Sequence, residues 1–332
     1  MLQLGHLHIS FPVIQAALSG YSDAPMRKIA RRFGAEFTLC EVMLDQFVVA
    51  VSKRKSKLYF ATHEIDHPCG AQLMGSEPAQ FAAAAQRLVH EGIDLIDLNF
   101  ACPVRKVLGR QRGGFLMSDP DTALDIVERV RAGVPDKVPV TVKLRKGFDD
   151  SPLSHENFYR ILDGAIERGI GGVTVHGRTV KQRYTGLSDW DFLKEVKTHL
   201  VQRGRSDISL IGSGDLFDAE TCLQRYRESG VDGLALARGV IGNPWLFREV
   251  RAAFEGKPIP AKPPLDEQRA IIAEHLRLAV ELYGESRSAT TMRAFGVKYA
   301  KLHPEYETVR SAFAQAKSVA DWYAIFDRYY KN

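Results

Sequence analysis

Two side chains that could do chemistry on a bound molecule, the amide of Asn99 and the thiol of Cys102, stand at the end of the segment 93–103, IDLIDLNFACP. They fall where an apolar strand would meet a loop. That loop is rich in glycine and carries four cations and no acid before Phe115, namely Arg105, Lys106, Arg110 and Arg112. A thiol beside such a loop suggests proton chemistry on an anionic polymer. Because a lone cysteine is more often a small buried residue, the other elements must decide whether this thiol is reactive.

The composition narrows the class of protein. The chain has 332 residues, of which 45% are hydrophobic and 26% charged, as in soluble globular proteins with room for one large and one small domain. It has no apolar run of about 18 residues and no basic, then apolar, N-terminal segment, so we expect neither a membrane span nor a secretory signal. The net charge of +5 is compatible with a nucleic-acid partner.

The four cysteines, Cys40, Cys69, Cys102 and Cys222, form no CxxC pair. This spacing argues against a zinc site and a disulfide framework and fits a reducing compartment. We therefore expect a cytoplasmic protein without a metal site, a membrane anchor or an obligate protein partner.

Short apolar segments alternate with amphipathic ones along most of the chain. Strands are expected at 13–18, 36–42, 68–74, 93–100, 138–145, 172–177, 209–214 and 233–239. Helices are expected at 23–33, 77–91, 119–132, 154–168, 189–200, 218–229 and 243–254. This alternation predicts a parallel sheet, and its length favours a closed (β/α)8 TIM barrel. An open doubly wound sheet is the rival, but no GxGxxG follows the first strand.

The Pro-rich segment 256–264 interrupts this pattern. Four helical patterns and no strand follow, at 265–283, 286–302, 307–317 and 320–330. We therefore expect a barrel domain at 1–255, a linker at 256–264 and a small all-α domain at 265–332.

The strand register points polar side chains into the barrel. If the apolar positions face the surrounding helices, then Gln72, Asn99, Lys143 and His176 face inward near the C-terminal ends of their strands, where barrel active sites lie. The same rule turns Arg145 inward, and Arg178 if its strand continues that far. Any one of these residues could be structural, but their convergence predicts a site.

The last two strands end in small residues that could hold a phosphate. They end in Gly212-Ser213-Gly214 and Ala237-Arg238-Gly239. Small residues let backbone N–H groups approach a ligand, and loops after strands seven and eight of barrels often bind phosphate. Arg238 would add a positive charge.

A phosphate site, a lysine, amides and a thiol together fit flavin mononucleotide (FMN). Lys143 would favour the reduced form of the flavin, and Cys102 would act as a proton donor, since an unperturbed thiol is mostly protonated at neutral pH. A flavin-free lyase with Lys143 as a Schiff base, and an RNA-binding protein without catalysis, are the rival interpretations.

Several segments resemble motifs of the dihydrouridine synthase family, the flavin enzymes that reduce uridine in tRNA. They are 16–27, 72–76, 97–103, 140–145, 175–179 and 238–247, and the resemblance, closest to the bacterial B-type branch, covers nearly the whole chain. The chain departs from the family at Ala17-Leu18, Phe100-Ala101, Ser213 and Ala237. In the tail, Arg293 is followed by Ala294-Phe295 where the family often has Arg-Lys-His, which leaves the RNA target more open than the reaction.

The resemblance implies NADPH-dependent reduction of the uracil C5–C6 double bond through FMN, with the helical tail docking tRNA. Cys102 would protonate C5 while reduced flavin delivers a hydride to C6, and NADPH would leave before RNA enters. The implied substrate contacts are Asn99, Arg178, Arg105 and Lys106. The implied cofactor contacts are Ala17, Leu18, Gln72, Lys143, His176, Gly212, Ser213, Gly214, Ala237, Arg238 and Gly239. Another structured RNA, such as rRNA, or a small pyrimidine or enone are the alternative substrates.

Clusters of cations are expected to steer the RNA backbone. They are Lys53–Lys55 with Lys57, the loop 105–112, and Arg178, Lys181 and Arg183. Binding through such contacts should weaken steeply with salt.

Overall fold

The structure is a computed structural model that describes residues 1–52, 56, 59–60 and 66–331. The cations predicted as an RNA-steering cluster at 53–55 and 57 lie outside the described residues.

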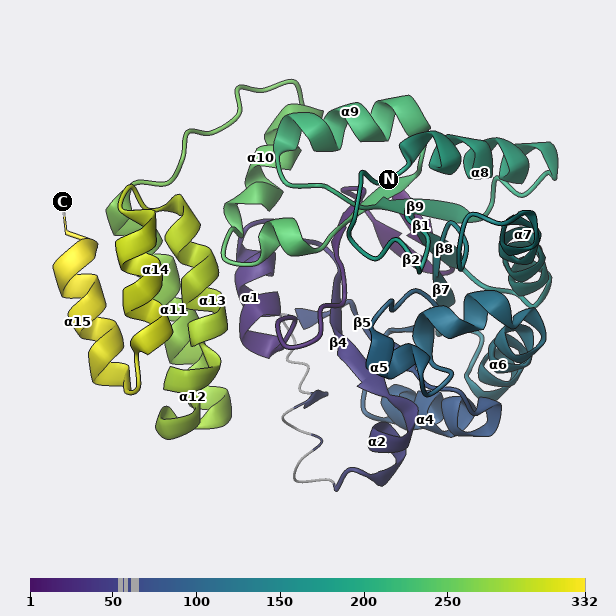
Figure 1. The fold of residues 1–332 in the computed structure, drawn as a ribbon, viewed down its shortest axis with the longest axis horizontal. Helices are drawn as coiled ribbons and strands as arrows, with labels where there is room; N and C mark the ends of the chain where they lie inside the picture. The colour runs from purple at the N-terminus through teal and green to yellow at the C-terminus, as the bar shows by residue number, and fades with distance from the viewer. Residues whose placement is uncertain (53–55, 57–58, 61–65, 332) are drawn as a thin grey trace.

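Eight parallel strands close into a barrel, as the sequence predicts (Figure 1). The ring closes by pairing of the last strand with the first. The strands are β3 (Val13–Gln15), β4 (Thr38–Leu44), β5 (Cys69–Met74), β6 (Leu95–Asn99), β7 (Val140–Arg145), β8 (Gly172–His176), β9 (Ser209–Ser213) and β10 (Gly233–Leu236). The fold class of a (β/α)8 TIM barrel is therefore confirmed.

Helices surround the barrel and bury the outward apolar positions of its strands. They are α1 (Ala24–Arg32), α4 (Pro78–His90), α6 (Pro120–Gly133), α7 (Pro152–Glu167), α8 (Trp190–Gln202), α9 (Ala219–Ser229) and α10 (Trp245–Phe254). Several begin at a side chain that caps the first turn, as Asp119 does by accepting a hydrogen bond from the backbone N–H of Thr122 at 3.2 Å. Shorter helices, α2 (Asp45–Ala50) and α5 (Arg105–Leu108), lie in the loops after β4 and β6.

An N-terminal hairpin, β1 (Leu2–Leu4) with β2 (Leu7–Ile9), was not expected from the sequence. Its buried side chains pack with the inward residues Ile14, Leu95 and Ile211 in one apolar cluster. This cluster fills the end of the barrel opposite the C-terminal strand ends, so the polar inward residues are left at the other end.

The C-terminal region is helical, and its helices pack beside the barrel near α1 and α10 (Figure 1). Between α10 and this region, residues 257–264 contain no helix or strand. The helices are α11 (Leu265–Tyr283), α12 (Glu285–Thr291), α13 (Arg293–Tyr299), α14 (Tyr306–Gln315) and α15 (Val319–Tyr329), so the predicted helix 286–302 is divided at Met292.

Two contacts join this region to the barrel loop before α1. The Tyr283 hydroxyl donates a hydrogen bond to Asp23 Oδ2 at 2.9 Å. The rings of Tyr21 and Phe295 meet edge to face, with centroids 5.2 Å apart. The helical region is thereby held at the rim of the barrel.

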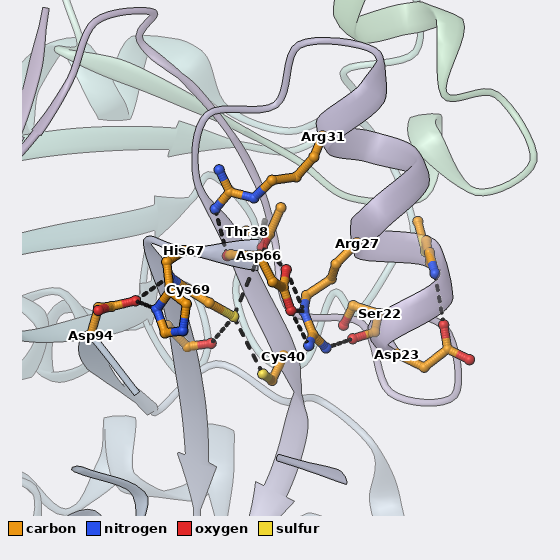
Figure 2. Close-up of polar contacts among 12 residues, drawn as sticks. Ser22, Asp23, Arg27, Arg31, Thr38, Cys40, Asp66, His67, Cys69 and Asp94 are labelled. Carbon is orange, nitrogen blue, oxygen red and sulfur yellow. Dashed lines mark hydrogen bonds and ion pairs between the residues drawn. The ribbon is translucent and has the colours of Figure 1, made fainter. Parts of the chain in front are cut away.

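A buried ion pair fixes α1 against β4 and the segment before β5 (Figure 2). Arg27 Nη2 lies 2.6 Å from Asp66 Oδ2, and neither side chain is exposed by more than 1%. The Thr38 hydroxyl and the Arg31 guanidinium contact Asp66 as well. Contacts among Arg27, Arg31, Thr38 and Asp66 therefore hold α1, β4 and the segment before β5 together.

We predict that Asp66→Asn lowers the free energy of unfolding by about 3 kcal/mol, because it leaves a buried guanidinium without its carboxylate. Urea titration followed by circular dichroism measures this loss. Asp125→Asn is the matched control, since Asp125 pairs with Arg129 on the surface and should contribute less than about 1 kcal/mol. Equal stability of the two variants would contradict a structural role for the buried pair.

Candidate active site

A chain of hydrogen bonds orients the polar residues at the barrel mouth. Asp97 lies inside the barrel. Its carboxylate accepts hydrogen bonds from Thr141 Oγ1 and Gln72 Nε2, at 2.6 Å each. The amide oxygen of Gln72 is therefore turned toward Asn99, whose Nδ2 donates to it at 2.6 Å. Because an ionised carboxylate only accepts hydrogen bonds, Asp97 sets the orientation of both amides.

Asn99 in turn holds the loop that carries the thiol. Its Oδ1 accepts hydrogen bonds from the backbone N–H groups of Ala101 and Cys102, both at 3.0 Å. On the other side, Gly113 has a φ of 57°, and a Cβ there would lie 2.8 Å from Cys102 Cβ. Glycine is therefore required at this turn, which packs directly against Cys102.

The Cys102 thiol is partly buried, and burial raises its pKa above the ordinary value, with a smaller opposing effect from Arg145. The thiol is therefore protonated at neutral pH. A protonated thiol on a fixed loop suits a general acid.

The Lys143 ammonium group has no hydrogen-bonding partner among the described residues. Its Nζ is buried at the cavity wall and forms no hydrogen bond with the residues that the structure describes. Burial lowers the pKa of Lys143 to about 8, against the attraction of Asp97. A buried donor of this kind costs free energy unless a ligand accepts its hydrogen bonds.

His176 faces the same cavity as a neutral donor. Burial lowers its pKa to about 2, and the nearby cations Arg145 and Lys143 act in the same direction. Its Nδ1 accepts a hydrogen bond from the backbone N–H of Arg178 at 3.2 Å. The proton of the neutral ring is therefore on Nε2, which is free to donate to a ligand.

The loops after β9 and β10 form the opposite wall. Arg238 lies over the rings of Tyr184 and Phe217, with its guanidinium carbon 4.6 and 5.4 Å from their centroids. Its Nη2 is 3.3 Å from Asp215 Oδ1. The guanidinium is thus held in place at the cavity while its side chain stays 40% exposed.

These groups line one cavity of about 420 Å³ at the C-terminal ends of the strands. Of the residues that the sequence proposes for the site, the described lining of this cavity includes Ala17, Leu18, Gln72, Asn99, Cys102, Lys143, His176, Ser213, Gly214, Ala237, Arg238 and Gly239.

Four proposed residues lie outside this lining. Gly212 turns toward α8, where a Cβ would come within 2.5 Å of the Trp190 ring. Arg178 is buried and forms a bidentate ion pair with Asp215, at 3.0 and 2.7 Å. Arg105 and Lys106 are exposed on α5.

The structure adds residues that the sequence did not place in the site. Arg145 lines the cavity and donates hydrogen bonds from Nε to the Ala101 carbonyl and from Nη1 to the Thr179 carbonyl, both at 2.9 Å. Its inward position two residues after Lys143 was the available signal. Tyr184 and Asp215 lie on loops. Their positions depend on tertiary contacts, which the spacing of residues in the sequence does not predict.

The donor set fits a flavin mononucleotide. The unpartnered Lys143 ammonium and the His176 N–H supply donors for the acceptor atoms of a flavin. Small residues at Ala16, Ala17 and Ala235 leave room for a flat ring, and Arg238 supplies charge for a phosphate. Among the described residues no group of three or more His, Cys, Asp and Glu side chains could hold a metal. No described helix has the length and apolarity needed to cross a membrane.

Residues 14–329 match the family described as dihydrouridine synthase. The chain is 33% identical over 286 residues to a probable tRNA-dihydrouridine synthase of Rickettsia conorii, covering 86% of this chain and 83% of that protein. It is 30% identical to tRNA-dihydrouridine synthase B of Shewanella oneidensis over 338 residues, covering 99% of this chain and 98% of that protein.

Similar solved structures share the fold. An old yellow enzyme homologue from Zymomonas mobilis has a TM-score of 0.55 at 15% identity, over 79% of this chain and 93% of that one. Morphinone reductase in complex with tetrahydroNAD has the same TM-score and identity, over 79% and 91%.

Proposed function

The chain belongs to the dihydrouridine synthase family, and from this premise we propose that it reduces specific uridines in tRNA to 5,6-dihydrouridine, with bound FMN and with NADPH as the reductant. The observation that supports this most strongly is one cavity lined by both a protonated thiol and an unpartnered buried ammonium group. The first group can donate a proton to a substrate, and the second can stabilise negative charge on a cofactor.

Each residue has a role that follows from its contacts. Lys143, His176 and Arg238 would hold FMN, which in its reduced form would supply the hydride for C6 of uracil. Cys102 donates its proton to C5, and the thiolate is then reprotonated from solvent. Asn99 fixes the Cys102 loop through Oδ1 and keeps the second N–H of Nδ2 for a uracil carbonyl.

The neighbouring cations position groups rather than contact the uracil. Arg145 holds the carbonyl of Ala101 next to the thiol. Arg178 holds Asp215, which in turn pairs with Arg238. Arg105, exposed on α5, remains available for the RNA backbone. The target base must leave its stack to enter the cavity, which costs least in RNA loops.

The activity is tested with purified protein, NADPH and tRNA that lacks dihydrouridine. We expect a yellow protein that consumes NADPH and adds two hydrogen atoms to a uridine, as read by mass spectrometry of the digested RNA. Ribosomal RNA and free uridine are the comparison substrates. Conversion of either of them but not of tRNA would contradict the proposed substrate.

The pH dependence of the rate of RNA reduction should follow the ionisation of the Cys102 thiol. Because the acid must be protonated and burial raises the pKa of the Cys102 thiol above its ordinary value, the rate of RNA reduction by pre-reduced protein should stay level through neutral pH and fall only at alkaline pH, above the range where an ordinary thiol ionises. Rapid mixing with RNA at each pH measures this rate. In Cys102→Ala the slow residual rate should lack the alkaline decline. If the decline persists there, another group, such as Lys143, is the one that titrates.

A further inference from the structure

A second cavity of about 480 Å³ adjoins the first at the barrel mouth. The two cavities share Ser19, Val42 and Val104 as lining residues, so a ligand can extend from one into the other. Residues of the β4–α2 segment and of the loop that contains α5 line the second cavity. No step of uridine reduction described above requires it.

The charge of this cavity favours an anion. Lys106, Arg110 and Arg112 line it, whereas Glu41 is the one carboxylate residue among its described lining residues. The Glu41 carboxylate already accepts a hydrogen bond from the backbone N–H of Gly20 at 2.7 Å. Three cations therefore face one acid that has a partner.

The side chain of Arg112 is buried and has no hydrogen-bonding partner among the described residues. It is 8% exposed, its Nε has no acceptor, and its guanidinium forms no hydrogen bond or ion pair within the described part of the chain. Asp45 attracts it only through longer-range electrostatics. Because its Nε is buried without an acceptor, this guanidinium costs free energy that a ligand with several acceptor oxygens would recover.

Two aromatic rings complete the cavity. Phe47 and Tyr59 meet edge to face with centroids 4.7 Å apart, and both line the cavity beside the cations. Aromatic faces next to cations are the features that bind a nucleobase with its phosphate. The second cavity thus fits a nucleotide.

We propose that the second cavity binds the adenosine end of NADPH, with the 2′-phosphate at Arg110 and Arg112 and the adenine against Phe47 and Tyr59. This rests on the proposed function, because the nicotinamide end has to reach the flavin in the first cavity. A phosphate monoester carries nearly two negative charges and is a terminal group, so it can reach the buried Arg112 end-on, beside the exposed Arg110. An RNA phosphodiester carries one charge and is flanked by sugars, so it is poorly shaped to reach Arg112, and Arg105, which lies outside the described lining of this cavity, serves it better.

Binding of two small probes to the purified flavoprotein tests the proposal without any turnover. Isothermal titration should show adenosine 2′,5′-bisphosphate binding about 10- to 100-fold more tightly than 5′-AMP, because only the first presents a 2′-phosphate. Arg110→Gln and Arg112→Gln should each remove most of this preference. Arg129→Gln, an exposed cation on α6, should keep it. Equal affinity of the two nucleotides in the wild type would overturn the proposal, as would an unchanged preference in both variants.

Reduction kinetics separate the coenzyme from RNA. In Arg110→Gln the NADPH concentration for half-maximal flavin reduction should rise about tenfold, while that for NADH stays within about twofold. If the variant is instead reduced normally by NADPH but, after reduction by dithionite, reacts slowly with RNA, the cavity binds RNA and the proposal is wrong. A wild type that prefers the bisphosphate yet never reduces uridine would contradict the proposed function while still supporting the nucleotide cavity.

Discussion

Cys102→Ala lowers the rate of dihydrouridine formation by about 100- to 10,000-fold, the range that a general acid contributes. The backbone of the loop should keep its place, because Asn99 Oδ1 holds the N–H groups of residues 101 and 102, which the substitution retains. Flavin binding and reduction by NADPH should therefore continue at nearly the wild-type rate. Only the proton for C5 is lost.

Anaerobic single-turnover mixing measures this effect. Protein reduced with dithionite is mixed with RNA, and the return of flavin absorbance reports the reaction. Cys222→Ala is the matched control, since Cys222 is buried on α9 and lies outside the described cavity lining. A Cys102→Ala protein that reoxidised with RNA at the wild-type rate would exclude the thiol as the acid.

Lys143→Met lowers the reduction potential of the bound flavin by about 60 mV, which for two electrons is about 2.8 kcal/mol. Methionine has a similar length but offers neither charge nor donor. The Lys143 ammonium has no competing hydrogen-bond partner among the described residues, so its effect on the cofactor should be large. The rate of reduction by NADPH should fall with the potential.

Equilibrium reduction against a reference dye measures the potential without RNA. Lys143→Arg, which keeps the positive charge, should recover most of it. An unchanged potential in Lys143→Met would place the ammonium away from the part of the cofactor that gains charge.

The barrel and most of the residues at its mouth could be predicted, because side chains alternate between the two faces of a strand. Outward apolar residues must meet helices, so Gln72, Asn99, Lys143 and His176 had to point inward, and the structure places all four in one cavity. The N-terminal hairpin was missed because short strands such as Leu2–Leu4 lack a distinctive pattern until they pack across the end of the barrel.

Residues on loops could not be placed by the same reasoning. Gly212 lies outside the described cavity lining, and the Trp190 ring occupies the space that a side chain at this position would fill. The ion pair of Arg178 with Asp215 could not be foreseen, because the position of Asp215 depends on how its loop folds. Similarly, the sequence does not distinguish the cations of the basic loop after Cys102. Arg105 is exposed and Arg112 is buried, and this difference depends on how α5 packs against the barrel.

The mass of RNA after incubation with this protein reports directly on the proposed reduction of uridine. Purified wild-type protein, NADPH and tRNA lacking dihydrouridine should yield tRNA in which a defined uridine has gained two hydrogen atoms. Cys102→Ala should yield almost none in the same time. Unchanged tRNA after prolonged incubation with flavin-loaded wild-type protein would contradict the account.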